Sequence, residues 1–215
     1  MPGPSRITPD GRPALRPVTE GPQHPAGQGG GRTILDLCGG TGAWSRPYAE
    51  AGYDVRLVTL PAQDVRDFAR GYEAAPFPVH GILAAPPCTE FAVSGARWWA
   101  GKPPGLLAEA LEIVDACLSI IKAAAPVWWA LENPVGRLKA LRMSEPAMTF
   151  DPCDYGDPWT KRTLLWGEFA HPVKAPVPAT EFWGWRKLGG KSERTKRLRS
   201  ITPPGFAHAF FEVNR

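Results

Sequence analysis

The stretch TILDLCGGTG, residues 33–42, decides the fold. Its first five residues form an apolar run rich in strand-favouring side chains, and glycines follow directly. This pattern predicts a parallel strand buried on both faces, then a turn into a helix. Glycines in such a turn let a nucleotide-like ligand approach the backbone, but they also allow close packing of helix on strand. The turn alone leaves both interpretations open.

Strands and helices alternate after this turn. The helix at 106–124 has the clearest pattern, because apolar residues recur along it at helical spacing. The alternation predicts an α/β fold, a doubly wound Rossmann-like sheet with helices on both faces and ligands at the strand carboxyl ends. We expect strands at 33–37, 54–59, 80–85, 127–132 and 162–166, and helices at 43–51, 106–124 and 204–213.

Length and composition predict one domain. The chain has 215 residues, 43% of them hydrophobic, which is enough for one core. Residues 1–32 are rich in Pro and Gly and are expected to form a flexible arm, leaving 33–215 as the domain. Apolar runs fall short of the roughly 20 residues that cross a bilayer, so we expect an intracellular, cytoplasmic protein without membrane contact. The spacing of Cys and His predicts no metal site.

Charge is unevenly distributed along the chain. Residues 33–167 hold 12 Lys and Arg against 15 Asp and Glu, whereas residues 168–215 hold 9 against 4. We expect residues 168–199 to form an irregular, basic insertion. Its mixture of cations with Trp183 and Trp185 favours contacts to DNA phosphates, although a basic surface also serves solubility.

Two further motifs follow predicted strands. In AAPPCTEF (84–91), Cys88 comes directly after two prolines, whose fixed backbone would point the thiol outward, as a nucleophile requires. A buried cysteine is otherwise a small apolar side chain. In LENP (131–134), Glu132 ends a very apolar strand, where burial would raise its pKa and let it donate a proton to a ring nitrogen. The alternative for this motif is a turn capped by Asn133.

These motifs, in this order, resemble those of the DNA cytosine-C5 methyltransferases. The resemblance rests on DLCGGTG (36–42), APPCTEF (85–91) and LENP (131–134). In addition, YGDPWTKRTLLWG (155–167) is similar to the segment that supplies a basic active-site residue, and ITPPGFAHAFF (201–211) to the closing helix. The resemblance is to a small, phage-like member, acting in a bacterial or phage-infected cell. It implies S-adenosylmethionine as cofactor and methyl transfer to C5 of cytosine in DNA through a covalent Cys adduct.

The resemblance also implies a role for each residue. Cys88 would attack C6 of cytosine, Glu132 would hold N3 and the exocyclic amine, and Arg162 would neutralise charge, with Lys161 as its rival. The target base would be flipped out of the duplex or already unpaired. The implied cofactor-binding residues are Asp36, Cys38, Gly39, Gly40, Gly42, Asp64 and Pro86. The implied substrate-binding residues are Pro87, Asn133 and Lys161, with Asn133 orienting the loop of the two prolines.

Arg97 is a further candidate for substrate contact. It stands beside Trp98 and Trp99 in a loop after the Cys88 motif. Aromatic side chains next to a cation can stack on nucleic-acid bases, although aromatic pairs also fill cores.

The sequence departs from the family at three points. The strand at 54–59 ends in Val58, Thr59 and Leu60 where the family has an acid for the ribose hydroxyls. Arg199 and Ser200 stand where a GlyAsn pair is usual. Only residues 168–199 are available for target recognition, where the family has a large domain. Recognition would therefore depend on loops or on a protein partner.

Two alternatives to cytosine methylation of DNA stay open. The first is the same chemistry on RNA or a free cytosine nucleotide, and the second is a catalytically silent relative that only binds DNA.

Overall fold

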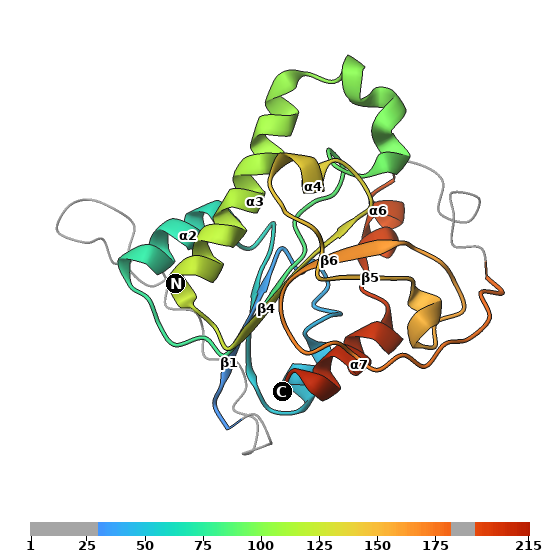
Figure 1. Cartoon of the computed structure of the whole chain (residues 1–215). Helices are drawn as coiled ribbons and strands as arrows, with labels where there is room; N and C mark the ends of the chain where they lie inside the picture. The colour runs from blue at the N-terminus through green and yellow to red at the C-terminus, as the bar shows by residue number, and fades with distance from the viewer. Residues whose placement is uncertain (1–29, 182–191) are drawn as a thin grey trace, which may run out of the picture.

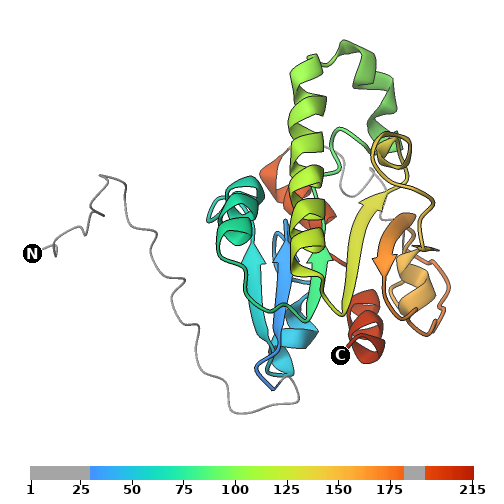
Figure 2. The same cartoon turned by 60° about the vertical axis from the view of Figure 1, so that its left-hand side comes forward.

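The computed structural model describes residues 30–181 and 192–215 (Figure 1). Most of the arm expected at 1–32 and the middle of the basic insertion lie outside these residues. A six-stranded sheet in the order β2-β1-β3-β4-β6-β5 runs through the molecule, with helices on both faces (Figures 1 and 2). The predicted α/β class with a helix-covered sheet is confirmed. In the described residues, no helix is both long enough and apolar enough to cross a membrane.

The elements follow the predicted alternation. The strands are β1 (Thr33–Leu37), β2 (Asp54–Val58), β3 (Gly81–Ala84), β4 (Trp128–Pro134), β5 (Met148–Phe150) and β6 (Thr163–Glu168). The α-helices are α1 (Arg46–Glu50), α2 (Val65–Ala74), α3 (Pro104–Ala124), α4 (Leu138–Leu141), α6 (Glu193–Ser200) and α7 (Pro204–Val213). Two 3-10 helices complete the fold, η1 (Val93–Gly101) and η2 (Pro152–Tyr155).

Each face of the sheet has its own core. Strands β1 and β3 are buried along their whole length, because helices cover both of their faces. On one face α2 and α3 pack on aliphatic side chains such as Leu35 and Ile82. On the other face α1 and α7 build a largely aromatic core, in which the rings of Trp44 and Phe210 lie 5.5 Å apart. Stacked and edge-on rings of this kind stabilise a core beyond their buried area.

Three α-helices were not predicted from the sequence: α2, α4 and α6. Helix α2 is a short amphipathic helix that begins where Asp64 accepts a hydrogen bond from the Arg66 backbone N–H at 2.8 Å. Helix α6 begins within 168–199, a segment expected to be irregular, and ends at Ser200. Its charged sequence, ERTKRLRS, has too few apolar residues to produce a helical pattern.

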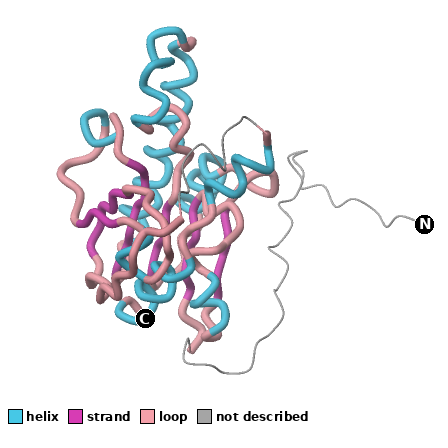
Figure 3. Tube along the Cα trace, turned by 90° about the vertical axis from the view of Figure 1, so that its right-hand side faces the viewer, coloured by secondary structure: helices cyan, strands magenta, loops and turns pink. Residues whose placement is uncertain are grey.

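The reversal of strand direction at β6 positions the site. Strands β1 to β4 are parallel, whereas β6 runs antiparallel to β4, with Thr163 opposite Pro134. Residues just before β6 therefore reach the same edge of the sheet as the carboxyl ends of β1, β3 and β4. Above this edge, α3 and η1 project together beyond the strands (Figures 2 and 3).

Candidate active site

The glycine turn after β1 is tightly folded. Gly40 and Gly42 have φ values of 57° and 67°, and Cys38 also has a positive φ, 58°. Glycine accepts this left-handed conformation without strain. A Cβ at Gly39 would lie 2.1 Å from Oδ1 of Asp36, so a side chain there has no room. The glycines thus let the backbone fold tightly over Asp36.

Asp36 supports the turn from below. Its side chain is fully buried, and the Ser45 hydroxyl donates a hydrogen bond to Oδ2 at 2.5 Å. Burial raises the pKa of Asp36 to about 6, against the opposing effect of the hydrogen bonds from Ser45. The carboxyl group lies beneath Gly39, so any part it plays in cofactor binding is indirect, through the shape of the turn.

Replacing Asp36 by asparagine should change how stability depends on pH. A carboxyl whose pKa rises from 3.8 to about 6 on folding destabilises the fold as pH increases through that interval. Two pKa units correspond to about 3 kcal/mol. Asp36→Asn keeps an oxygen for Ser45 but does not titrate, so its stability relative to the wild type should rise by about 2–3 kcal/mol between pH 4 and pH 7. Chemical denaturation at several pH values measures this difference, and a pH-independent difference would contradict it.

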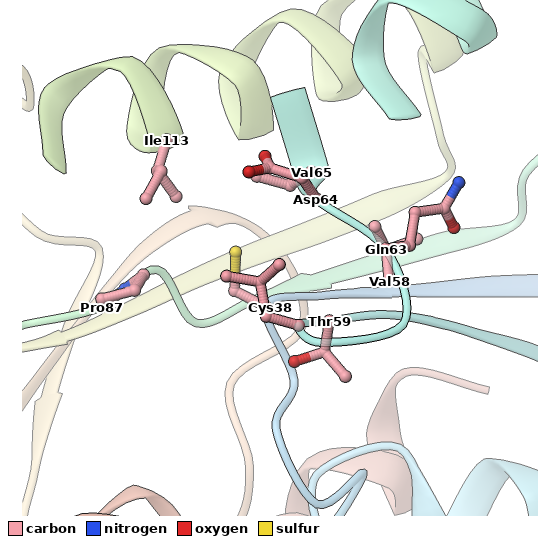
Figure 4. A pocket seen from close by; sticks show the side chains of 9 residues that line it. Cys38, Val58, Thr59, Gln63, Asp64, Val65, Pro87 and Ile113 are labelled. Atoms are coloured by element: carbon pink, nitrogen blue, oxygen red, sulfur yellow. The ribbon is translucent and has the colours of Figure 1, made fainter. Parts of the chain in front are cut away.

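A cavity of about 100 Å³ opens beside the turn, at the carboxyl ends of β1 and β2 (Figure 4). Ligand pockets commonly enclose roughly 300–1,000 Å³, so this cavity suits one flat ring of a larger ligand. Helix α3 closes one side through Ile113, and the start of α2 closes another (Figure 4). The lining residues are Cys38, Val58, Thr59, Leu60, Gln63, Asp64, Val65, Pro87 and Ile113.

Asp64 provides the carboxylate at the cavity. Arg66 donates to it from its backbone N–H at 2.8 Å and from its guanidinium at 3.0 and 2.7 Å. These hydrogen bonds lower the pKa of Asp64 to about 2. The group is therefore an ionised acceptor, fixed in place at the first turn of α2.

Cys88 and Glu132 come from neighbouring strands. Cys88 follows β3 and Glu132 lies in β4, and β3 and β4 pair in parallel. The Cys88 residue is exposed, yet desolvation by the surrounding protein raises the pKa of its thiol, and the charge of Glu132 raises it further. Lys161 lowers the pKa of the thiol, and its Nζ lies 3.9 Å from Oε1 of Glu132. The sulfur, the carboxylate and the ammonium thus share one site.

The prolines before Cys88 are tied to β4. Asn133 is buried, and its amide donates a hydrogen bond to the Pro86 carbonyl at 3.0 Å. Pro86 itself is buried, whereas Pro87 lines the cavity. Pro86, which we expected to contact the cofactor, thus does not line the cavity, and Pro87, which we expected to contact the substrate, does.

Arg162 and Lys161 point to different partners. The Arg162 guanidinium donates to Oδ2 of Asp151 at 2.7 Å, whereas Lys161 lies beside Glu132. Successive residues of an extended segment point to opposite sides, which explains the separation. The geometry places Lys161, rather than Arg162, nearest to the glutamate.

Arg97 lies on η1, beyond Cys88 in the chain. Its guanidinium stacks over the ring of Trp98 at 4.0 Å, and Trp98 is 52% exposed. Lys102 anchors η1 to the loop after Cys88 through an ion pair with Glu90 at 2.7 Å. The exposed Arg97–Trp98 pair therefore lies on a 3-10 helix that is anchored to the loop that holds the thiol.

Several residues at the site were not assigned to it from the sequence, among them Ile113 and Arg199. Ile113 shows only the ordinary apolar spacing of a core helix, so nothing in the sequence marks it as a cavity residue. Arg199 was noted only as a departure from the family pattern and as part of a basic stretch, yet its charge also lowers the pKa of Cys88.

Comparison with known proteins gives a likeness in structure only. No family model matches the chain, and no curated protein matches its sequence. Among solved structures, it is similar to a candidate DNA modification methyltransferase encoded within a prophage of E. coli. The two share 16% sequence identity with a TM-score of 0.47, and the match covers 75% of this chain and 56% of that chain. The chain thus spans little more than half the length of that protein.

Proposed function

We propose that the chain is an S-adenosylmethionine-dependent DNA methyltransferase that acts at C5 of cytosine. The observation that carries this proposal is the meeting of Cys88, Glu132 and Lys161 beside a glycine turn that borders a cavity. A nucleophile, a proton donor and a cation are the groups that attack on a pyrimidine ring requires.

The cavity fits the adenine end of the cofactor. Its walls are mainly apolar, and Asp64 supplies an acceptor for an amino group at the edge. The remainder of the molecule would pass over the turn at Gly39 to Gly42, where the absence of side chains lets backbone N–H groups approach it. Thr59 lines the same cavity and accepts a hydrogen bond from the Gly40 N–H at 3.3 Å, so its hydroxyl would be available to hold the ribose. When bound, S-adenosylmethionine supplies an electrophilic methyl group.

The chain's own residues prepare the base. The Cys88 thiolate attacks C6 of cytosine while Glu132 delivers a proton to N3, which makes C5 nucleophilic enough to accept the methyl group. Loss of the C5 proton to water, expulsion of the Cys88 thiolate and return of the N3 proton to Glu132 then restore the aromatic ring and the enzyme. Lys161 balances the charge of Glu132, and Asn133 fixes the backbone that presents Cys88.

A nucleic acid is the substrate favoured by the charge near the site. Helix α6 ends beside Lys161, and its exposed Arg194 and Arg199 carry positive charge. The stacked Arg97–Trp98 pair offers a further exposed surface on which a base could stack. These groups favour DNA or RNA over a free nucleotide.

Transfer of a labelled methyl group tests the proposal. We expect label from S-adenosylmethionine to appear as 5-methylcytosine in DNA, and to appear at lower yield or not at all in RNA and free cytidine nucleotides. Label in RNA alone would mean that RNA, and not DNA, is the substrate of the same reaction. Binding of DNA with no transfer to any substrate would identify a silent relative and overturn the proposal.

Replacing Asp64 by asparagine tests the cofactor site. The variant keeps an oxygen that can cap α2 but loses the ionised acceptor, so we expect about tenfold weaker binding of S-adenosylmethionine by calorimetry. Asp67→Asn is the matched control, because Asp67 is an exposed partner of Arg70 on the same helix. Equal affinity of the two variants would contradict the assigned site.

A further inference from the structure

The 3-10 helix η1 is fastened at its base to the loops that follow β3 and β4. The Cys88 carbonyl accepts hydrogen bonds from the backbone N–H groups of Phe91 and Ala92, at 2.9 and 2.8 Å, and η1 begins at the next residue. Val93, its first residue, donates from its N–H to the Val135 carbonyl at 2.8 Å. Helix η1 is therefore held beside the proposed reaction site from two sides, and it stands beyond the carboxyl ends of the strands (Figure 2).

Trp99 belongs to this attachment. The Arg137 guanidinium lies over its ring, 4.3 Å from the centroid, and donates a hydrogen bond from Nε to the Glu90 carbonyl at 2.7 Å. The indole Nε1 of Trp99 is buried. Lys102, just after η1, ties the other end of the helix through its ion pair with Glu90. Trp99 is thus an aromatic side chain that holds η1 in place.

Trp98 points away from this attachment. Successive residues of a 3-10 helix lie about 120° apart around its axis, so the two indoles do not share a face. Trp98 is 52% exposed, although a side chain this large is ordinarily well buried. The Arg97 guanidinium lies over the ring, 4.0 Å from its centroid. The indole therefore offers a flat aromatic surface, with a cation beside it, to a ligand.

The charge around Trp98 favours a nucleic acid over an apolar protein surface. The sequence of η1, VSGARWWAG, contains one cation and no acidic residue. Lys161 and the carboxyl end of α6 lie at the same edge of the sheet, and Arg194 and Arg199 of that helix are exposed. An aromatic ring with cations near it is the combination that binds nucleic-acid bases and their phosphates.

The exposed ring can stack only on a base whose face is free. Inside a duplex each base face is covered by the neighbouring base pair, whereas a single strand leaves the faces open. The proposed reaction likewise requires a cytosine outside the stack. An unpaired strand satisfies both requirements without the free energy that opening a duplex costs.

We propose that Trp98 is a stacking platform for an unpaired base of the DNA beside the target cytosine, and that the protein binds a single strand in preference to a duplex. This inference rests on the proposed function for the identity of the polymer. It adds the strand state of the substrate. It also gives the two tryptophans different roles, with Trp99 holding η1 and Trp98 contacting the DNA.

Binding of fluorescein-labelled DNA to the full-length protein without cofactor tests the inference by fluorescence anisotropy. The probes are a single strand of about 12 nucleotides that contains cytosine and a hairpin duplex with the same sequence. We expect the wild type to bind the single strand more tightly. Trp98→Ala should bind it about tenfold more weakly, because a stacked base is lost. The slope of affinity against salt should stay unchanged, because stacking neutralises no phosphate. Trp98→Phe should restore most of the affinity, because it restores an aromatic face.

Val127→Ala is the control. Val127 is 75% exposed and precedes β4, so the variant removes an exposed apolar side chain at the other end of that strand from Glu132 and should bind as the wild type does. Wild-type affinity of Trp98→Ala for the single strand would overturn the inference. So would a loss that Trp98→Phe fails to restore, or a hairpin bound as tightly as the single strand.

Sedimentation of the same variants addresses a second copy of the chain as the occupant of this surface. Self-association of the wild type that Trp98→Ala abolishes, with DNA binding kept, would assign the ring to a contact between copies and would also overturn the inference. The binding assay needs neither cofactor nor turnover, whereas label transfer tests the proposed function. The two can therefore fail separately.

Discussion

Cys88→Ala is expected to abolish both methyl transfer and covalent capture on DNA that contains 5-fluorocytosine. Fluorine at C5 cannot leave as the proton does, so the adduct between the Cys88 sulfur and C6 should persist in the wild type. Without the sulfur no adduct forms, and turnover should fall at least about a thousandfold, as in other enzymes that lose a nucleophile. Denaturing gel electrophoresis detects the captured complex, and label transfer measures turnover.

Cys153→Ala is the control for this experiment. Cys153 is also a free, partly exposed cysteine, but it belongs to η2 rather than to the loop after β3. We expect the Cys153→Ala variant to form the adduct through Cys88 at the wild-type rate. A captured complex that survives Cys88→Ala, or a wild type that forms none, would remove Cys88 from the proposed mechanism.

Glu132→Gln is expected to have two opposite effects. Turnover should fall by about 10²–10⁴-fold, because the amide cannot deliver a proton to N3. Alkylation of Cys88 should become faster at pH 7, because the charge of Glu132 raises the pKa of the thiol and its removal lowers that pKa. A variant that was merely misfolded would not combine lost turnover with a more reactive cysteine at one position.

Glu168→Gln is the matched change at the other end of the same pair of strands. Glu168 ends β6 opposite Trp129, whereas Glu132 is opposite Leu165. We expect Glu168→Gln to leave turnover and alkylation unchanged. Unchanged turnover in Glu132→Gln would mean that the carboxyl group is not the proton donor.

The sequence predicts the centre of the sheet well and its periphery poorly. Residues 33–37 form β1, because a buried parallel strand requires an unbroken apolar run that is easy to recognise. The three residues of β5 lie at the edge of the sheet, where too few residues are buried to produce a pattern. Helix α2 is short, and its signal in the sequence consists only of an Asp64 cap before apolar residues at 65, 69 and 72.

The candidate site was predictable where it depends on strand ends. Cys88 and Glu132 follow neighbouring parallel strands, so the α/β topology alone brings them to one edge. The choice between Lys161 and Arg162 depends on which way each side chain points at the start of β6, and on the presence of Asp151 to bind Arg162. The position of Arg199 depends on a long return of the chain that local patterns do not describe.

The antiparallel direction of β6 determines where a longer segment could be inserted into the chain. Because β6 leaves the edge of the sheet that holds Lys161 and ends at Glu168 on the opposite side, the chain must return before α6 can reach Lys161. The described part of that return, residues 169–181, lies outside the six strands of the sheet. A longer insertion placed there would therefore leave the pairing of β4 with β6 unchanged, and with it the proposed site.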